Sequence, residues 1–136
     1  MASSPAFIMT PRIGAVAVST ANTGRDGTGT IATVLTAAAA TATSTGGTRI
    51  LKIVLQATAD PADCVVTLFL HDGAAYWLFD EVDLGNPDPA STTVPAYRVA
   101  RPYANLVLPA GWSLRAAITV ALTAGVVNVI ALGGDL

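Results

Sequence analysis

Residues 111–136, GWSLRAAITVALTAGVVNVIALGGDL, carry no charge between Arg115 and Asp135, and this stretch constrains the fold more than any other. A segment of this length and apolarity is either one membrane-spanning helix or two β-strands joined by a turn. The first possibility would make a membrane-anchored protein. The second would make an all-β domain in which this stretch belongs to the core.

The residue pattern favours the two strands. Over residues 112–122 larger apolar side chains alternate with Ser, Arg, Thr and Ala, which is the period of a strand with one buried face. Gly125 would weaken a helix but suits a turn, and the far end has no Lys or Arg to set an orientation in a membrane. The sequence therefore predicts a closing hairpin of residues 112–122 and 126–132, broken at residues 124–125.

The second half of that hairpin is apolar on both faces. One face is expected to hold Val126, Ile130 and Leu132, and the other Val127, Val129 and Ala131. A strand with one solvated face normally shows polar residues on it, so two-sided apolarity predicts a cover on each side. The second cover is either another protein subunit or a loop of the same chain.

Composition also points to covered surfaces. Hydrophobic residues make up 52% of the 136-residue chain and charged residues 12%, against about a quarter in typical soluble domains. A chain of this size is expected to form one domain with a sizeable core. So few charges leave surface that partners are expected to cover. The formal net charge of −2 and the scattered Arg residues argue against nucleic acid, which requires several cations on one face.

Residues 1–11 are expected to form an extended arm ahead of a single β-sandwich domain at residues 12–136. Pro5 and Pro11 interrupt the apolar run near the start, so no secretory signal is expected. The candidates for docking the arm on a neighbouring protein are Phe7, Ile8, Met9 and Arg12.

The rest of the chain has the pattern of short strands separated by turns rich in Gly, Pro, Asn and Asp. The Ala-rich run at 37–47 is expected to be a loop, because Thr, Ser and Gly-Gly interrupt it. Strands are expected at residues 12–19, 30–36, 49–58, 65–71, 76–84, 97–100 and 104–108, followed by the closing hairpin. About eight strands without a convincing helix predict an all-β antiparallel β-sandwich of jelly-roll type.

Alternation along two of these strands predicts which side chains share a face. In the strand at 49–58, the core face is expected to hold Leu51, Ile53, Leu55 and Ala57, with Lys52 and Gln56 opposite. In the strand that returns from the Asp72-Gly73 turn, one face is expected to hold Tyr76, Leu78, Asp80, Val82 and Leu84, and the other Trp77, Phe79, Glu81 and Asp83.

No motif for catalysis, metal binding or cofactor binding stands out. His71 beside Asp72 could be an oriented base, but at the mouth of a tight turn a local hydrogen-bonding role is expected. Cys64 lies in a strand pattern and is expected to be a buried free thiol. The acids at 80–83 alternate between faces and form neither a carboxylate pair nor a calcium loop. We expect no enzyme activity, no metal and no cofactor.

Three stretches, TPRIGAVAVSTANTGRDGTGTIATVLTA (10–37), VTLFLHDGAAYWLFDEV (66–82) and LVLPAGWSLRAAITVALTAGVVNVIALGGDL (106–136), resemble small virion proteins encoded among the head and tail genes of tailed bacteriophages. The resemblance implies a capsid decoration, or cement, protein without catalytic residues, made in the host cytoplasm and bound to the outside of the phage head. It also implies a homotrimer over junctions between capsomers, with an N-terminal arm against the major capsid protein.

Few aromatic residues are available, so Trp77 and Trp112 are expected as core or interface anchors. With Val127 and Val129 of the two-sided strand, they are the candidate oligomer contacts. Two other functions stay open. One is a phage tail or baseplate accessory domain that binds host glycans through the two tryptophans or residues 86–95, and the other is a hydrolase that uses His71.

Overall fold

The computed structural model describes residues 10–59, 63–85, 90–122 and 124–136, and these residues form eight β-strands. Among them there is no helix long and apolar enough to cross a bilayer. The strands are β1 (Thr10–Val18), β2 (Ala32–Thr36), β3 (Thr48–Ala57), β4 (Cys64–His71), β5 (Tyr76–Gly85), β6 (Arg98–Leu108), β7 (Ser113–Ile118) and β8 (Val127–Asp135).

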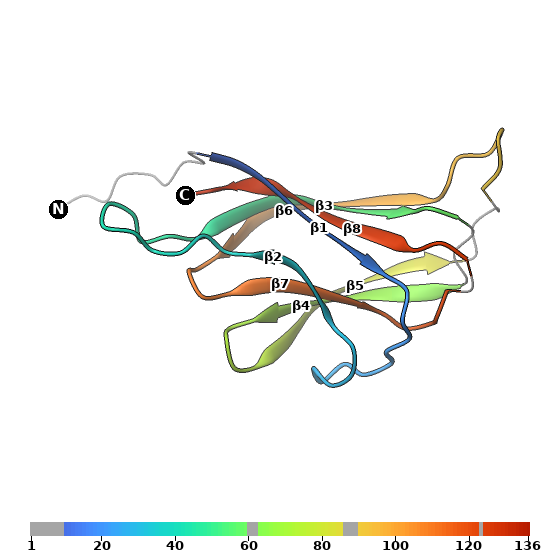
Figure 1. Cartoon of the computed structure of the whole chain (residues 1–136), viewed down its shortest axis with the longest axis horizontal. Coiled ribbons are helices and arrows are strands. Elements are labelled where there is room, and N and C mark those ends of the chain that lie inside the picture. The colour runs from blue at the N-terminus through green and yellow to red at the C-terminus, as the bar shows by residue number, and fades with distance from the viewer. Residues whose placement is uncertain (1–9, 60–62, 86–89, 123) are drawn as a thin grey trace.

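The strands form two four-stranded sheets that pack face to face, with the order β1-β8-β3-β6 in one layer and β2-β7-β4-β5 in the other (Figure 1). Every neighbouring pair within a sheet is antiparallel. The first strand pairs with the last, the second with the seventh, the third with the sixth and the fourth with the fifth. The prediction of an antiparallel β-sandwich with about eight strands is confirmed.

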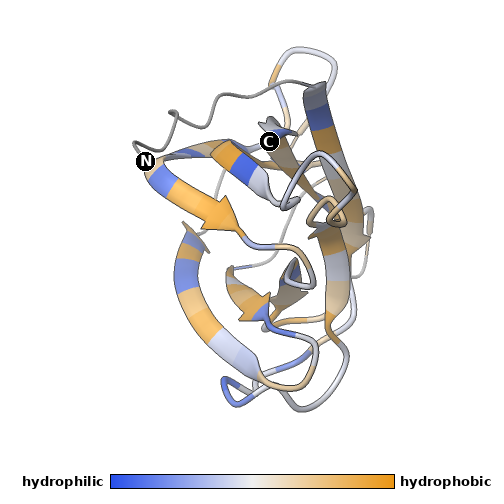
Figure 2. Cartoon of the chain, turned by 90° about the vertical axis from the view of Figure 1, so that its left-hand side faces the viewer, coloured by the Kyte–Doolittle hydropathy of each residue, from blue (hydrophilic) through white to orange (hydrophobic). Residues whose placement is uncertain are grey.

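The core lies between the two sheets and is built from alternate residues of each strand. Leu55 of β3, Leu68 of β4, Leu114 of β7 and Val129 of β8 are all at most 1% exposed. Hydrophobic stretches therefore occur in the strands of both layers (Figure 2). The charge-free C-terminal stretch belongs to this core, as the alternation predicted.

The prediction of a closing hairpin is wrong. β7 lies between β2 and β4, whereas β8 lies between β1 and β3, so the two strands belong to opposite sheets. In the connection between them, the Thr119 N–H donates to the Val65 carbonyl and the Leu122 N–H to the Ser19 carbonyl. A hairpin within one sheet and a connection that crosses between sheets both join two strands of alternating apolar residues through a turn. The sequence pattern is therefore the same for both. The connection is long enough to cross the roughly 10 Å between packed sheets.

The described part of the chain covers β8 fully on only one of its faces. Val127, Val129 and Ala131 are 0% exposed in the core, whereas the alternate residues Asn128, Ile130 and Leu132 are half-buried on the far side of the sheet. The assignment of Val127 and Val129 to an oligomer interface is therefore corrected, because the chain's own second sheet already covers them.

The strands covered on both faces are β7 and its neighbour β4. The outward-facing Ala117 of β7 is 2% exposed and Thr67 beside it on β4 is 0% exposed. The loop at residues 22–29 is anchored to this sheet, because the Asn22 N–H donates to the Ile118 carbonyl and Arg25 forms an ion pair with Glu81. A loop of the same chain thus supplies a second cover, but at a different strand from the predicted one.

Most of the two predicted strand faces are confirmed, since Ile53, Leu55 and Ala57 of β3 and Val82 and Leu84 of β5 lie in the core, but bulges move individual residues. The register of β3 shifts between Ile50 and Lys52, so Ile50 is buried and Leu51 is 43% exposed instead of lying in the core. The register between β4 and β5 shifts at Phe79, which has no partner residue on β4. Phe79 consequently packs against the core together with Val82, rather than sharing the solvent face with Glu81.

Strand bounds at two places also differ from the sequence prediction. β1 begins at Thr10, because Thr10 pairs with Asp135 and Pro11 with Gly134, so the predicted arm loses its last two residues to the sheet. Phe7, Ile8 and Met9 lie outside the described residues. The pieces expected at 97–100 and 104–108 are one strand, β6, which tolerates Pro102 because it lies at the edge of its sheet.

Candidate functional site

The solvent-facing side of the β1-β8-β3-β6 sheet, here called the outer face, is the most distinctive surface of the molecule. The strand register aligns its side chains in rows that cross all four strands. The rows are Ala17–Asn128–Gln56–Arg98, Ala15–Ile130–Val54–Ala100 and Ile13–Leu132–Lys52–Pro102, with the bulged Leu51 and the Arg49 and Val107 pair beyond them.

The middle row of the outer face is apolar from edge to edge. Ile130 and Val54 pack side by side at its centre, so Val54 is only 6% exposed although it lies outside the core. Around this band, Ile13 is 69% exposed, Val107 46% and Leu51 43%. Several large apolar side chains exposed on one face mark a candidate site of contact with other protein or a membrane, because leaving them in water is unfavourable.

The centre of the opposite sheet is covered among the described residues, although Trp77 and Leu78 at its β5 edge are 55% and 41% exposed. There the loop at 22–29 is tied to the sheet, and Phe69 of β4 is 0% exposed beneath the Tyr76 ring, with which it makes an edge-on contact at 6.1 Å. An added Cβ on Gly27 would lie 2.6 Å from the Tyr76 Cβ, so the loop lies directly on β5. Among the residues that the structure describes, a loop therefore covers part of one sheet, and none covers the outer face of the other.

Arg12, a candidate docking residue, forms an ion pair within the domain and keeps 33% of its side chain exposed. Its guanidinium lies 3.1 Å from the Asp135 carboxylate, and the Thr48 hydroxyl donates to the same carboxylate at 2.8 Å. The pairing joins β1, β3 and β8 at the end of the sandwich where β1 begins. The Arg12 ion pair therefore holds β1 against β8, and an N-terminal arm would consist of residues that precede β1.

The His71 region is a turn rather than an acid–base pair. The His71 Nδ1 atom accepts the Gly73 N–H at 3.3 Å, and its ring lies 4.3 Å from the Tyr76 ring. The Asp72 carboxylate accepts the N–H groups of Ala74 and Ala75, both at 2.8 Å, and the indole N–H of Trp77 at 3.1 Å. These donors, chiefly the Ala75 N–H, lower the pKa of Asp72 to about 2. The carboxylate is therefore directed at the turn and does not orient His71.

Cys64 is buried at 4% exposure and is a free thiol. Burial, followed by the negative charges of Asp63 and Asp83, raises its pKa above the usual value, so the reactive thiolate is disfavoured. Among the described residues, no three His, Cys, Asp or Glu side chains come close enough together to hold a metal ion.

The two tryptophans do not form a shared platform. Trp77 is 55% exposed with its indole N–H bound to Asp72, whereas Trp112 packs against the core. Trp77 therefore remains a candidate surface contact, and Trp112 is mainly a core residue. Of the glycan-binding loop considered at residues 86–95, residues 86–89 lie outside the described part of the chain.

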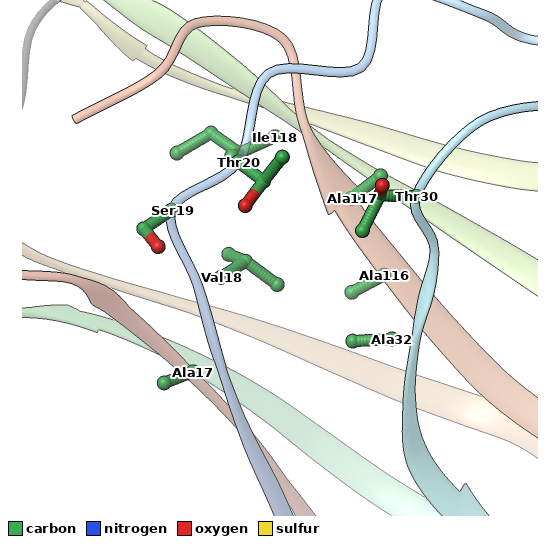
Figure 3. A pocket seen from close by; sticks show the side chains of 9 residues that line it. All are labelled: Ala17, Val18, Ser19, Thr20, Thr30, Ala32, Ala116, Ala117 and Ile118. Carbon is green, nitrogen blue, oxygen red and sulfur yellow. The ribbon is translucent and has the colours of Figure 1, made fainter.

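A small hollow lies between the end of β1 and the start of β2, above β7 (Figure 3). Its volume is about 80 Å³, and its lining is mostly small: Ala17, Ala32 and Ala116, with the hydroxyls of Ser19, Thr20 and Thr30. Ligand pockets typically enclose about 300–1,000 Å³. This hollow is too small for a sugar ring or a cofactor.

Comparison with known proteins matches no protein-family model, no curated protein and no solved structure. The candidate site therefore rests on the geometry of the outer face. The bulge that exposes Leu51 and the crossing that places Ile130 and Leu132 outside were not foreseen from the sequence. The only signal for the outer face was the two-sided apolarity of residues 126–132.

Proposed function

We propose that this chain is a non-catalytic structural subunit that assembles with other protein through its outer face. The observation that carries the proposal is the apolar band across four strands, edged by the exposed Ile13, Leu51 and Val107. Within the described ranges, one loop lies over the other sheet and no loop lies over this one. Because only 12% of its residues are charged, the chain has few polar groups that would keep such a face soluble in water.

The particular role proposed is that of a capsid decoration, or cement, protein on the head of a tailed bacteriophage. The resemblance of residues 10–37, 66–82 and 106–136 to small phage virion proteins supports this role. The nested pairing of first strand with last and fourth with fifth supports a jelly roll, formed by a long hairpin folded over on itself. In this role the chain is made in the host cytoplasm, bound to the major capsid protein and located on the virion surface.

The proposed mechanism has two contacts, one between copies of the chain and one between each copy and the shell. The outer face joins copies into an oligomer, expected to be a homotrimer. The N-terminal arm, which now ends at residue 9, anchors each copy to the shell by adding a strand or lying in a groove. Phe7, Ile8 and Met9 supply its apolar side chains.

Magnitudes explain why many copies are required. An interface of standard size buries on the order of 400 Å² of apolar surface on each partner. Over both partners this is on the order of 800 Å², which at ~25 cal/mol per Å² contributes ~20 kcal/mol before side-chain ordering and imperfect desolvation are subtracted. Association itself costs about 4–15 kcal/mol in lost freedom. A single contact is therefore modest, and bridging of neighbouring capsomers by linked copies stabilises the shell through avidity.

Sedimentation with empty shells tests this proposal. The shells are assembled from the major capsid protein of the same genome, and the bound fraction is measured as the concentration of this chain is varied. Changing Phe7, Ile8 and Met9 to Ser should weaken binding at least tenfold, because each buried apolar side chain contributes about 1.5–3 kcal/mol. Gly substitutions at Ala2, Ser3 and Ser4 are the matched control and should change binding little.

Two outcomes would contradict the proposal. If the wild-type chain does not sediment with shells at any concentration, the capsid role is wrong. If the Ser variant binds as well as its Gly control, the arm is not the anchor. Circular dichroism of each variant checks that the β-sandwich remains folded.

A further inference from the structure

The first strand, β1, contributes little to the core that it borders. Its inward-facing positions hold Gly14, Val16 and Val18, of which only Val18 is buried, at 6% exposure. β1 is an edge strand and pairs only with β8 among the described strands. A hollow of about 80 Å³ lies beside its last residues, so their side chains lack packing partners on one side (Figure 3). Opening of β1 should therefore cost less free energy than opening of a core strand.

β1 is joined to the rest of the domain through residues 19–21, which can act as a hinge. The next residue, Asn22, is fixed, because its backbone N–H donates to the Ile118 carbonyl at 2.8 Å and its side-chain amide donates to two carbonyls of the following loop at 2.9 Å each. Within the hinge, the Ser19 carbonyl accepts the Leu122 N–H at 3.1 Å. β1 is the first of the described strands, so it can swing out on this hinge without displacing another strand.

The surface that β1 occupies, here called the β1 seat, is selective for a strand with the features of β1. It consists of the edge of β8 and the neighbouring residues of β2. Where β1 crosses β2, a Cβ at position 14 would lie 2.5 Å from the Leu35 Cβ, so the seat favours glycine there. Two residues earlier along β1, the Asp135 carboxylate receives the Arg12 guanidinium at 3.1 Å. A second copy of this chain carries the same cation and the same glycine at the same spacing, so its β1 fits the seat.

We infer that copies of this chain exchange β1, so that the strand of one copy fills the β1 seat of the next copy. The inference rests on the homo-oligomer of the proposed function and states how its copies are joined. Exchange restores the same backbone pairs and the same Arg12–Asp135 ion pair in every seat, so it is a low-cost route to an oligomer. Passing β1 around a ring of copies closes the assembly when the rotation between copies allows. Ile13, which is 69% exposed on the outer face, moves with the strand to the contact between copies, where its burial favours the oligomer.

Disulfide trapping distinguishes an exchanged β1 from one that stays in its own chain. Ala17 of β1 and Asn128 of β8 are partners in the register, and paired residues of antiparallel strands have Cα atoms about 4.5–5.5 Å apart, which a disulfide can span. The triple variant Cys64→Ala/Ala17→Cys/Asn128→Cys is purified in reduced form, concentrated to allow self-association and then oxidised. Denaturing gel electrophoresis without reductant should show covalent dimers and larger species, because each disulfide joins β1 of one copy to β8 of another.

Cys64→Ala/Gln56→Cys/Asn128→Cys is the matched control, because Gln56 of β3 pairs with the same Asn128 and β3 is not exchanged. It should remain a single covalent chain after oxidation. Thermal unfolding verifies that each variant is folded. The inference is overturned if the variant with Ala17→Cys forms disulfides only within one chain in an oligomeric sample, or if the wild-type chain is monomeric at all concentrations.

Charge exchange between two variants gives a second measurement, which requires no disulfide and uses the molar mass from light scattering. Arg12→Asp or Asp135→Arg places like charges in every seat, so each variant alone should self-associate about tenfold or more weakly than wild type. In a mixture of the two variants, exchange brings opposite charges together, and association should return to within about threefold of wild type. A mixture that associates no better than either variant alone would also overturn the inference. Shell sedimentation does not depend on exchange, so a chain that binds shells without exchanging β1 contradicts this contact and leaves the capsid role standing.

Discussion

Tyr103 of β6 donates its phenolic O–H to the Asp80 carboxylate of β5 at 2.8 Å, and this bond joins edge strands of the two sheets. The Arg101 Nε lies 3.5 Å from the same carboxylate oxygen, and the Phe79 and Tyr103 rings are 5.2 Å apart. Among the described strands, β5 and β6 share no backbone pairing. Side chains therefore close this side of the sandwich.

Tyr103→Phe should lower the free energy of unfolding by about 1–2 kcal/mol, because it removes a hydrogen bond to a charged group and keeps the ring contact with Phe79. Urea unfolding measures the change. Tyr97→Phe is the matched control, since the Tyr97 hydroxyl makes no hydrogen bond to another described residue; its effect should stay within about 0.5 kcal/mol. Equal losses in the two variants would show that the Asp80 bond does not stabilise the fold.

Gly14→Ala should destabilise the fold by about 1–3 kcal/mol through overpacking. A Cβ at position 14 would lie 2.5 Å from both the Leu35 Cβ and the Val34 carbonyl oxygen, where β1 crosses β2. Ala15→Ser, at the exposed neighbouring position, should change stability by less than about 0.5 kcal/mol. A Gly14→Ala variant as stable as wild type would mean that the two strands are farther apart than described.

Asp72 should make stability depend on pH in the acidic range. Its folded-state pKa of about 2 lies below the unfolded-state value near 4, so its contribution is complete above about pH 4 and is lost as pH falls through about 2. The difference in thermal midpoint between wild type and Asp72→Asn should therefore be largest near neutral pH and shrink towards about pH 2. A difference that is constant with pH would show that the turn does not hold the charged carboxylate.

Cys64 should react with a thiol reagent only after unfolding. Its 4% exposure and raised pKa disfavour the thiolate, which is the reactive form. Mass spectrometry after treatment with iodoacetamide should find the native chain unmodified and the urea-unfolded chain fully modified. Rapid modification of the native chain would place the thiol at the surface.

Alternation along the chain predicted where the strands lie, because burial of one face imposes a period of two on each strand. It could not predict which strands are neighbours. The stretch at 112–132 shows the same pattern whether Gly125 turns the chain within a sheet or carries it to the other sheet. Pairing is decided by contacts with β1, β2, β3 and β4, which are distant in sequence.

The outer face could be predicted only in part, for a related reason. One extra residue changes which side chains share a face on the two sides of a bulge, and Gly133 and Pro102 beside the Leu51 bulge lie on strands whose pairing with β3 is not local in sequence. Two-sided apolarity of residues 126–132 did indicate an additional cover for β8. It does not reveal which alternate set of residues lies inside, so it cannot separate Val127 and Val129 from Ile130 and Leu132 as candidate contacts.

A density map of shells decorated with this chain tests the central claim most directly. We expect copies on the outside of the shell at junctions between capsomers, with Ile13, Leu51 and Ile130 of each outer face covered by other protein. A map in which the chain occupies the shell with that face open to solvent, or in which no copy binds the shell, would contradict the account.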